Sequence, residues 1–209
     1  MNFAKTKFIS FNPTINFDFE ARLDINGKEI ETVDEMKLLG IKNTNDLKWR
    51  KNRDELTRRA YSKLWMIRRL TTKGADIDDL IDIYCKQVRS VLEFGVPVWN
   101  GSITKEEISD IEGVQRSFFH IVLGKEYSSY ESALEKLDME SLEERRLKLC
   151  ITFAKKAANH PKHQKWFVQN ETVGTETRSK KTKYKVPNAR LDRFKTSPIP
   201  YVTDLLNKL

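Results

Sequence analysis

The spacing of apolar residues changes once along this chain, near residue 47. Before that point apolar and polar residues tend to alternate, which is typical of half-buried strands, and after it apolar residues recur every three to four positions, which is typical of amphipathic helices. The alternating part predicts strands over residues 6–11, 22–25, 29–33 and 37–41, with Asn26-Gly27 as a tight hairpin turn. We expect these strands to form a small antiparallel sheet, and because four short strands are marginally stable alone, we expect the sheet to need a partner.

The helical part predicts a series of amphipathic helices. We expect helices over residues 49–72, from Asp76 as N-cap to a break at Gly95 and Pro97, from Ser102 or Thr104 to about residue 122, and over about 129–137 and 141–158. After residue 161 the pattern fades. Residues 170–197 are polar and basic with few apolar anchors, which predicts disorder in isolation, and residues 201–206 predict a short helix.

Composition and charge place the chain among proteins with polyanionic partners. No apolar run approaches the roughly 20 residues of a membrane span, and the N-terminus lacks a signal-peptide apolar block, so we expect a cytoplasmic or nuclear protein that is not secreted. Cys85 and Cys150 lie in apolar helical patterns and are interpreted as reduced core residues. Residues 145–209 hold 16 Lys+Arg against 4 Asp+Glu, a net +12, while the preceding residues hold 22 against 26, a net −4. This asymmetry favours nucleic acid as a partner; a solubilising basic tail is the alternative.

Several short blocks, in order, resemble a known family. Lys37-Leu38-Leu39-Gly40 followed by Leu47-Lys48-Trp49 is similar to the entry to the thumb in reverse transcriptases of jockey-type non-LTR (LINE-like) retrotransposons. Further blocks that fit their C-terminal portion are residues 2–7 (with Phe3 where proline is expected), Tyr84, and residues 89–99, 111–116, 142–146 and 197–201. The resemblance implies an α+β, mainly α fold: a palm-edge antiparallel β segment (1–46), a helical thumb-like and connection region (47–168), and a basic tail with a short C-terminal apolar segment (169–209).

The metal-binding aspartates of such polymerases have no counterpart here, because no apolar-Tyr-x-Asp-Asp-apolar hairpin is present. Asp78-Asp79 falls in the first turn of a predicted helix, where acids complement the helix dipole. Asp24 with Glu29 or Glu31 is interpreted as solvated sheet charge, and His160 with His163 as a polar helix end rather than a zinc site. We therefore expect no catalytic residue, metal or cofactor in this chain; Mg²⁺ belongs to the intact family enzyme.

The helix over residues 49–72 carries cations with few opposing acids, and like-charged neighbours such as Arg59 and Lys63 repel each other unless phosphates neutralise them. The predicted phosphate-binding residues here are Arg50, Lys51, Arg53, Arg58, Arg59, Lys63, Arg68 and Arg69. Further candidates are Lys5 and Lys7 on the first strand and Lys180, Lys181 and Lys183 in the tail. Trp49 and Trp65 are interpreted as core residues in preference to base-stacking platforms. Leu38, Leu39 and Gly40 resemble a primer-grip turn; an ordinary strand–turn is the alternative.

The function expected from the resemblance is that of a C-terminal portion of an RNA-directed DNA polymerase. It would grip RNA or DNA, as template–primer duplex, by the phosphate backbone, and would not polymerise alone. The expected protein partners are the fingers and palm of such an enzyme. The alternatives are a stand-alone basic nucleic-acid-binding protein and an inactive degenerate fragment.

Overall fold

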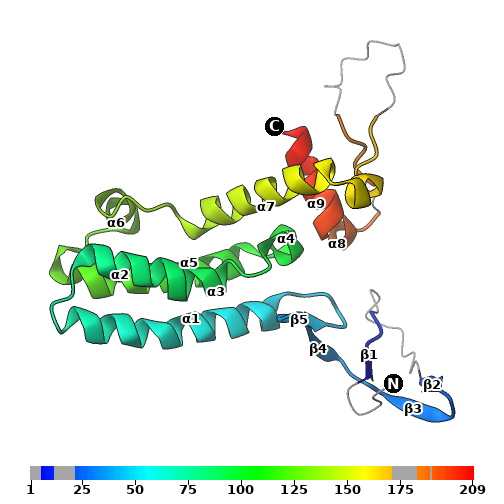
Figure 1. Ribbon diagram of the computed structural model, residues 1–209, viewed down its shortest axis with the longest axis horizontal. Coiled ribbons are helices and arrows are strands. Elements are labelled where there is room, and N and C mark those ends of the chain that lie inside the picture. The colour runs from blue at the N-terminus through cyan, green and yellow to red at the C-terminus, as the bar shows by residue number, and fades with distance from the viewer. Residues whose placement is uncertain (1–5, 12–21, 171–182, 189) are drawn as a thin grey trace.

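The computed structural model describes residues 6–11, 22–170, 183–188 and 190–209. Helices make up most of the described chain, and short strands gather at one end of it (Figure 1). The α+β, mainly α class is therefore confirmed. None of the described helices has the length and apolar character needed to cross a membrane.

The N-terminal strands form a three-stranded sheet in the order β1-β3-β2, from β1 (Lys7–Phe8), β2 (Leu23–Ile25) and β3 (Lys28–Thr32). β2 and β3 are joined by the predicted hairpin turn, where Asn26 and Gly27 have φ of 54° and 73°. β1, however, pairs with β3 in parallel, with Lys7 opposite Glu31. The expectation of an antiparallel sheet is therefore wrong for β1.

A second hairpin, β4 (Glu35–Leu38) and β5 (Ile41–Thr44), forms a separate two-stranded sheet. The prediction of a single strand over residues 37–41 is wrong, because the chain reverses inside that segment. Leu39 and Gly40 form the turn, with φ of 48° and 88°. Positive φ at both central residues matches the twist of the flanking strands. Leu39 adopts this left-handed conformation although it is not a glycine.

The helices follow the predicted order. They are α1 (Arg50–Thr71), α2 (Ile77–Ile83) continued by the π-helix η2 (Tyr84–Arg89) and α3 (Ser90–Leu92), α4 (Val96–Trp99) with η3 (Asn100–Ser102), α5 (Lys105–Leu123) with η4 (Gly124–Glu126), α6 (Tyr130–Lys136), α7 (Leu142–Asn159) and η5 (Pro161–Trp166). Thr104 and Ser141 begin α5 and α7 with capping boxes closed by Glu107 and Glu144. Gly95, with φ of 65°, separates α3 from α4. Asp76 stands at the predicted N-cap position, but its side chain makes no capping hydrogen bond.

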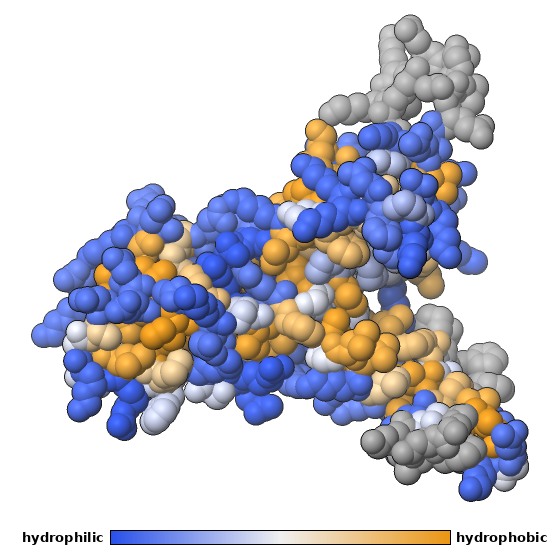
Figure 2. Space-filling view, in the orientation of Figure 1, coloured by the Kyte–Doolittle hydropathy of each residue, from blue (hydrophilic) through white to orange (hydrophobic). Residues whose placement is uncertain are grey.

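The main core lies between α1, the α2–α3 segment, α5 and α7. Its largest fully buried side chains include Trp99, Tyr84, Phe118 and Phe119, and the Tyr84 and Phe118 rings stack with centroids 4.1 Å apart. Figure 2 shows hydrophobic residues gathered between the helices, while hydrophilic residues cover much of their outer surfaces. Cys150 is buried in this core as predicted, and Cys85 is half-buried; both are free thiols.

The basic tail packs onto the helical region where the structure describes it. α8 (Asp192–Lys195) and α9 (Pro198–Asn207) follow one another, and α9 packs against α7. Tyr184 is buried beside Phe167, and its backbone N–H donates to Asn207 Oδ1 at 2.9 Å. The sequence predicts disorder for residues 170–197. Of these, residues 171–182 and 189 lie outside the described residues. For the described residues of this segment the prediction differs from the structure, because the buried Tyr184 side chain anchors the segment to the helical region.

Candidate nucleic-acid interface

α1 presents its cations on the side that faces away from the core. Leu56, Ala60, Leu64 and Ile67 are buried, as the apolar stripe predicts. Five of the predicted cations are exposed and have no ion pair with any described residue: Arg50, Arg58, Arg59, Arg68 and Arg69. Their charges are therefore available to an external anion.

Other predicted cations on α1 are engaged within the protein. The Arg53 side chain is only 14% exposed and forms ion pairs with Asp110 and Asp54, so its charge is already balanced within the protein. Its assignment to phosphate binding stays a prediction. Lys51 pairs with Glu35, and that hydrogen bond raises the pKa of Lys51. Lys63 is half-buried and donates to Gln87 Oε1 at 3.3 Å.

The two described predicted cations outside α1, Lys7 and Lys183, lie on different parts of the chain. Lys7 forms an ion pair with Glu31 at 3.0 Å on the three-stranded sheet. Lys183 is exposed and its ammonium lies 5.2 Å from the centre of the Tyr184 ring. Lys5, Lys180 and Lys181 lie outside the described residues. The structure thus does not gather the described members of the predicted set into one site, and most of its exposed described members lie on α1.

Trp65 lies on the exposed side of α1, so the interpretation of this residue as core is wrong, whereas Trp49 is buried as predicted. Trp65 is 65% exposed, and the Arg69 guanidinium carbon lies 5.4 Å from the centre of its ring. Arg58 precedes Trp65 by seven residues and Arg69 follows it by four, so an α-helix places all three on one side. The sequence contained this signal, because position 65 falls outside the apolar stripe.

The turn that resembles a primer grip projects from the β4–β5 hairpin. Leu38 is 57% exposed and Leu39 is 88% exposed. Gly40 lies so close to Phe94 that an added Cβ would come within 2.9 Å of its ring. The structure therefore gives Leu38 and Leu39 an exposed apolar surface and Gly40 a packing role.

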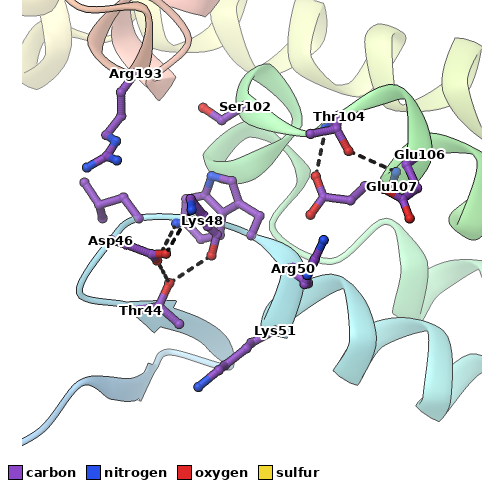
Figure 3. Close-up of a pocket in the computed structure, with 12 residues that line it drawn as sticks. Thr44, Asp46, Lys48, Arg50, Lys51, Ser102, Thr104, Glu106, Glu107 and Arg193 are labelled. Carbon is purple, nitrogen blue, oxygen red and sulfur yellow. Dashed lines mark hydrogen bonds and ion pairs between the residues drawn. The ribbon is translucent and has the colours of Figure 1, made fainter. Parts of the chain in front are cut away.

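A cleft of about 590 Å³ opens where the hairpin, the start of α1, the start of α5 and α8 meet (Figure 3). Its cations are Lys48, Arg50, Lys51 and Arg193. Asp46 Oδ1 accepts hydrogen bonds from Thr44 Oγ1 at 2.6 Å and from the Lys48 N–H at 3.0 Å. Burial raises the pKa of Asp46, but these hydrogen bonds outweigh burial and lower it overall.

Sequence reasoning did not place Arg193 in the same cleft as Arg50, because that arrangement depends on how the tail docks. Ser102 Oγ donates to the Thr196 carbonyl at 2.8 Å, and Asn100 Nδ2 donates to the Tyr201 hydroxyl at 3.0 Å. These bonds join positions more than 90 residues apart. Residue spacing carries no signal for such contacts.

The acidic and histidine candidates lie in separate groups on different elements: Asp24 is opposite Glu29 on the β2–β3 hairpin, and the others lie in the helical part. Asp78 and Asp79 occupy the first turn of α2, as the helical pattern predicted. His160 and His163 have ring centroids 4.9 Å apart, and His163 stacks on Trp166. In the part of the chain that the structure describes, no three His, Cys, Asp or Glu side chains are grouped so that they could hold a metal ion.

Comparisons with known proteins give the chain no relative. No protein-family model matches it, and neither a curated protein nor a solved structure does. The resemblance to retrotransposon reverse transcriptases therefore depends on the sequence blocks alone and stays a prediction.

Proposed function

We propose that this chain binds nucleic acid, without sequence preference, through the outer face of α1. This basic face consists of Arg58, Arg59, Trp65, Arg68 and Arg69. The observation that carries the proposal is the 65% exposure of Trp65, with an arginine over its ring and three more arginines that have no ion pair with a described residue. Burying an indole would normally stabilise the fold, so its position among cations favours an external partner.

The chemistry of these side chains suits a nucleic-acid strand. Arginine forms two parallel hydrogen bonds with a phosphate, and such contacts hold the backbone without reading its sequence. An exposed indole stacks on any base, because every base has an aromatic face. A basic helix that also offers one stacking surface therefore suits a junction between duplex and unpaired strand.

The finer proposal is that α1 serves as the thumb helix of a retrotransposon RNA-directed DNA polymerase and grips template–primer. It is supported by the sequence blocks and by the position of α1 directly after the β4–β5 hairpin with its exposed Leu38-Leu39 turn. Polymerisation itself is not assigned to residues of this chain.

The salt dependence of binding tests the basic face. We expect the quadruple variant Arg58→Gln, Arg59→Gln, Arg68→Gln and Arg69→Gln to bind a labelled duplex more weakly than the wild type. Its plot of log affinity against log salt should flatten by up to about 3.6, since each lost phosphate contact removes about 0.9 from the slope. Fluorescence anisotropy from 50 to 300 mM KCl measures this slope.

A matched control removes the same charge elsewhere. Lys105, Lys125, Lys155 and Lys156 are exposed on α5, η4 and α7 and have no ion pair with a described residue. Changing these four to Gln lowers net charge by the same four units, yet should leave the slope within about one unit of the wild type. Equal slopes in the two quadruple variants would contradict the proposal and assign binding to net charge.

A further inference from the structure

An apolar cavity lies between η5, the segment around residues 185–187, and the region where α8 gives way to α9. Its volume is about 610 Å³. Trp166, Val168 and Phe194 contribute apolar surface, and Pro187 and Pro198 contribute rigid walls without backbone N–H groups. Cavities of this volume with mostly apolar walls are typical of small-molecule sites.

The apolar side chains that line the cavity are exposed, while hydrogen bonding and ring stacking hold the segments that carry them. Val168 is 56% exposed and Phe194 is 48% exposed. Trp166 is held by stacking on His163, with ring centroids 4.2 Å apart and planes 25° apart. The Lys185 N–H donates to the Val168 carbonyl at 2.8 Å and joins the two sides of the wall. A ligand would therefore meet a preformed surface.

The charges at this cavity have one sign. Lys165 and Lys185 line it, both are exposed, and neither has an ion pair with a described residue. Among the described residues that line the cavity there is no Asp or Glu. The two lysines therefore favour an anion in the cavity, and no acidic side chain among the described lining residues repels it.

We propose that this cavity binds a small organic anion with a flat apolar body. The apolar body packs on Trp166, Phe194 and the prolines, and its carboxylate, sulfonate or phosphate group pairs with Lys165 and Lys185. The proposal is independent of the basic face on α1, because the two sites share no residue.

Binding of 8-anilinonaphthalene-1-sulfonate to the full chain tests this proposal. We expect one dye per chain, with energy transfer from tryptophan to the dye. Val168→Asp should weaken binding at least tenfold, because it places a like charge in the cavity. The double variant Lys165→Gln and Lys185→Gln should weaken it several-fold, and the neutral analogue N-phenyl-1-naphthylamine should be insensitive to that double variant.

The controls lie next to the cavity but do not line it. Val186→Asp and the pair Lys162→Gln and Lys183→Gln change the same residue types and should leave dye affinity unchanged. Competition then distinguishes two ligand sources: displacement by 2-naphthoate indicates a free aromatic acid, and displacement by adenosine monophosphate indicates a nucleotide. The proposal is overturned if Val168→Asp binds the dye as tightly as Val186→Asp with both folded by circular dichroism, or if neither competitor displaces the dye.

Discussion

At the scale of single residues, exposure decides which side chains face a partner and which hold the protein together. Trp65 and Trp49 are the same residue type near the same helix, yet Trp65 is 65% exposed and Trp49 only 7% exposed. The two cysteines differ in the same way, since Cys150 is fully buried and Cys85 is half-buried. Residue type therefore did not fix the role of either pair.

Replacing Trp65 by alanine should affect binding much more than stability. A change at so exposed a position should move the free energy of unfolding by no more than about 0.5 kcal/mol. Loss of one stacking contact costs about 1–3 kcal/mol, so affinity for single-stranded DNA should fall about tenfold. Anisotropy titration and urea unfolding measure the two effects. Phe153→Ala on α7, at a residue 40% exposed, is the control and should leave affinity unchanged.

Stability should fall at alkaline pH through Cys150. Burial raises the pKa of the Cys150 thiol from 9.0 to about 11. Between these values the unfolded chain loses the thiol proton while the folded chain keeps it, so the free energy of unfolding decreases as pH rises. The loss is absent below about pH 9 and complete above the folded pKa.

Urea unfolding at pH 8 and pH 10.5 checks this prediction by comparing variants. Cys150→Ala lowers stability at both pH values, because it leaves a cavity, but it should show a smaller decrease between them than the wild type. Cys85→Ala is the control and should keep the wild-type decrease. A decrease in Cys150→Ala equal to that of the wild type would count against the prediction.

At the scale of elements, glycines determine how the β4–β5 hairpin docks on the helices. Gly95 has φ of 65°, and an added Cβ would come within 2.6 Å of Ile41 Cδ1 on β5. Gly40, in the hairpin turn, approaches Phe94 in the same way. The hairpin therefore has a glycine, Gly40, where Phe94 packs against it, and the helical region has a glycine, Gly95, where Ile41 packs.

Gly95→Ala should destabilise the protein more than Gly74→Ala. Both glycines have positive φ, at 65° and 79°, so either substitution costs about 1–2 kcal/mol of backbone strain. A Cβ at Gly74 meets nothing within 4 Å, whereas one at Gly95 meets Ile41, which adds about 1–3 kcal/mol of overpacking. Chemical denaturation of both variants measures the difference, and equal losses would show that the hairpin shifts without cost.

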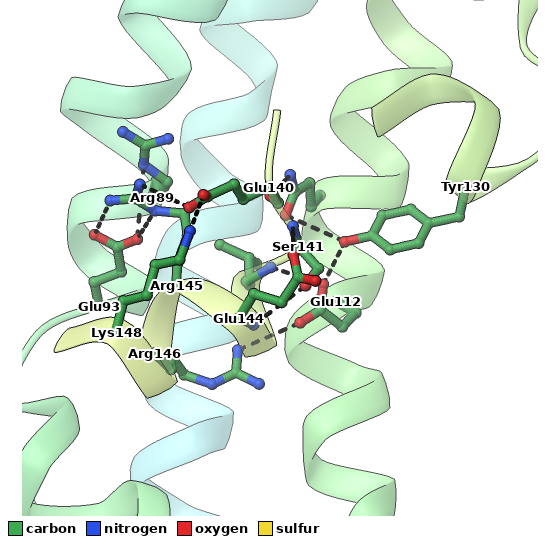
Figure 4. A network of polar contacts seen from close by, with 12 residues as sticks. Arg89, Glu93, Glu112, Tyr130, Glu140, Ser141, Glu144, Arg145, Arg146 and Lys148 are labelled. Carbon is green, nitrogen blue, oxygen red and sulfur yellow. Dashed lines mark hydrogen bonds and ion pairs between the residues drawn. The ribbon is translucent and has the colours of Figure 1, made fainter. Parts of the chain in front are cut away.

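At the scale of the whole molecule, a buried polar network connects α5, α6 and α7 (Figure 4). Glu112 Oε2 accepts hydrogen bonds from the Tyr130 hydroxyl and from the Leu142 N–H at 3.2 Å, and Arg146 Nη1 lies 3.6 Å from Glu112 Oε1. Arg146 Nε donates to Asn100 Oδ1 at 3.1 Å, and Asn100 in turn donates to Tyr201 of α9. Burial, together with the Glu112 hydrogen bond, raises the pKa of Tyr130. The tail is thus connected to the centre of the helical region.

Arg146→Met should be among the most destabilising single changes. It leaves the Glu112 carboxylate buried without its cation, which costs about 3–5 kcal/mol. The double variant Glu112→Gln and Arg146→Met should recover part of that loss, because a neutral amide keeps an acceptor for Tyr130 and Leu142. Equilibrium urea unfolding compares them. Arg145→Met, at the partly exposed pair with Glu93, is the control and should cost less.

The sequence by itself determined the order of the helices, the Asn26-Gly27 hairpin and most of the core, because periodicity and turn chemistry are local properties. It also placed cations and Trp65 on α1. Only the tertiary structure decided which of these side chains are engaged within the protein; Arg53, for example, pairs with Asp110, 57 residues away. It also decided that β1 pairs in parallel with β3. The docking of the tail adds Arg193 to the cleft that Arg50 lines and forms the apolar cavity beside α9. It also depends on contacts between distant segments, and neither composition nor spacing specifies such contacts.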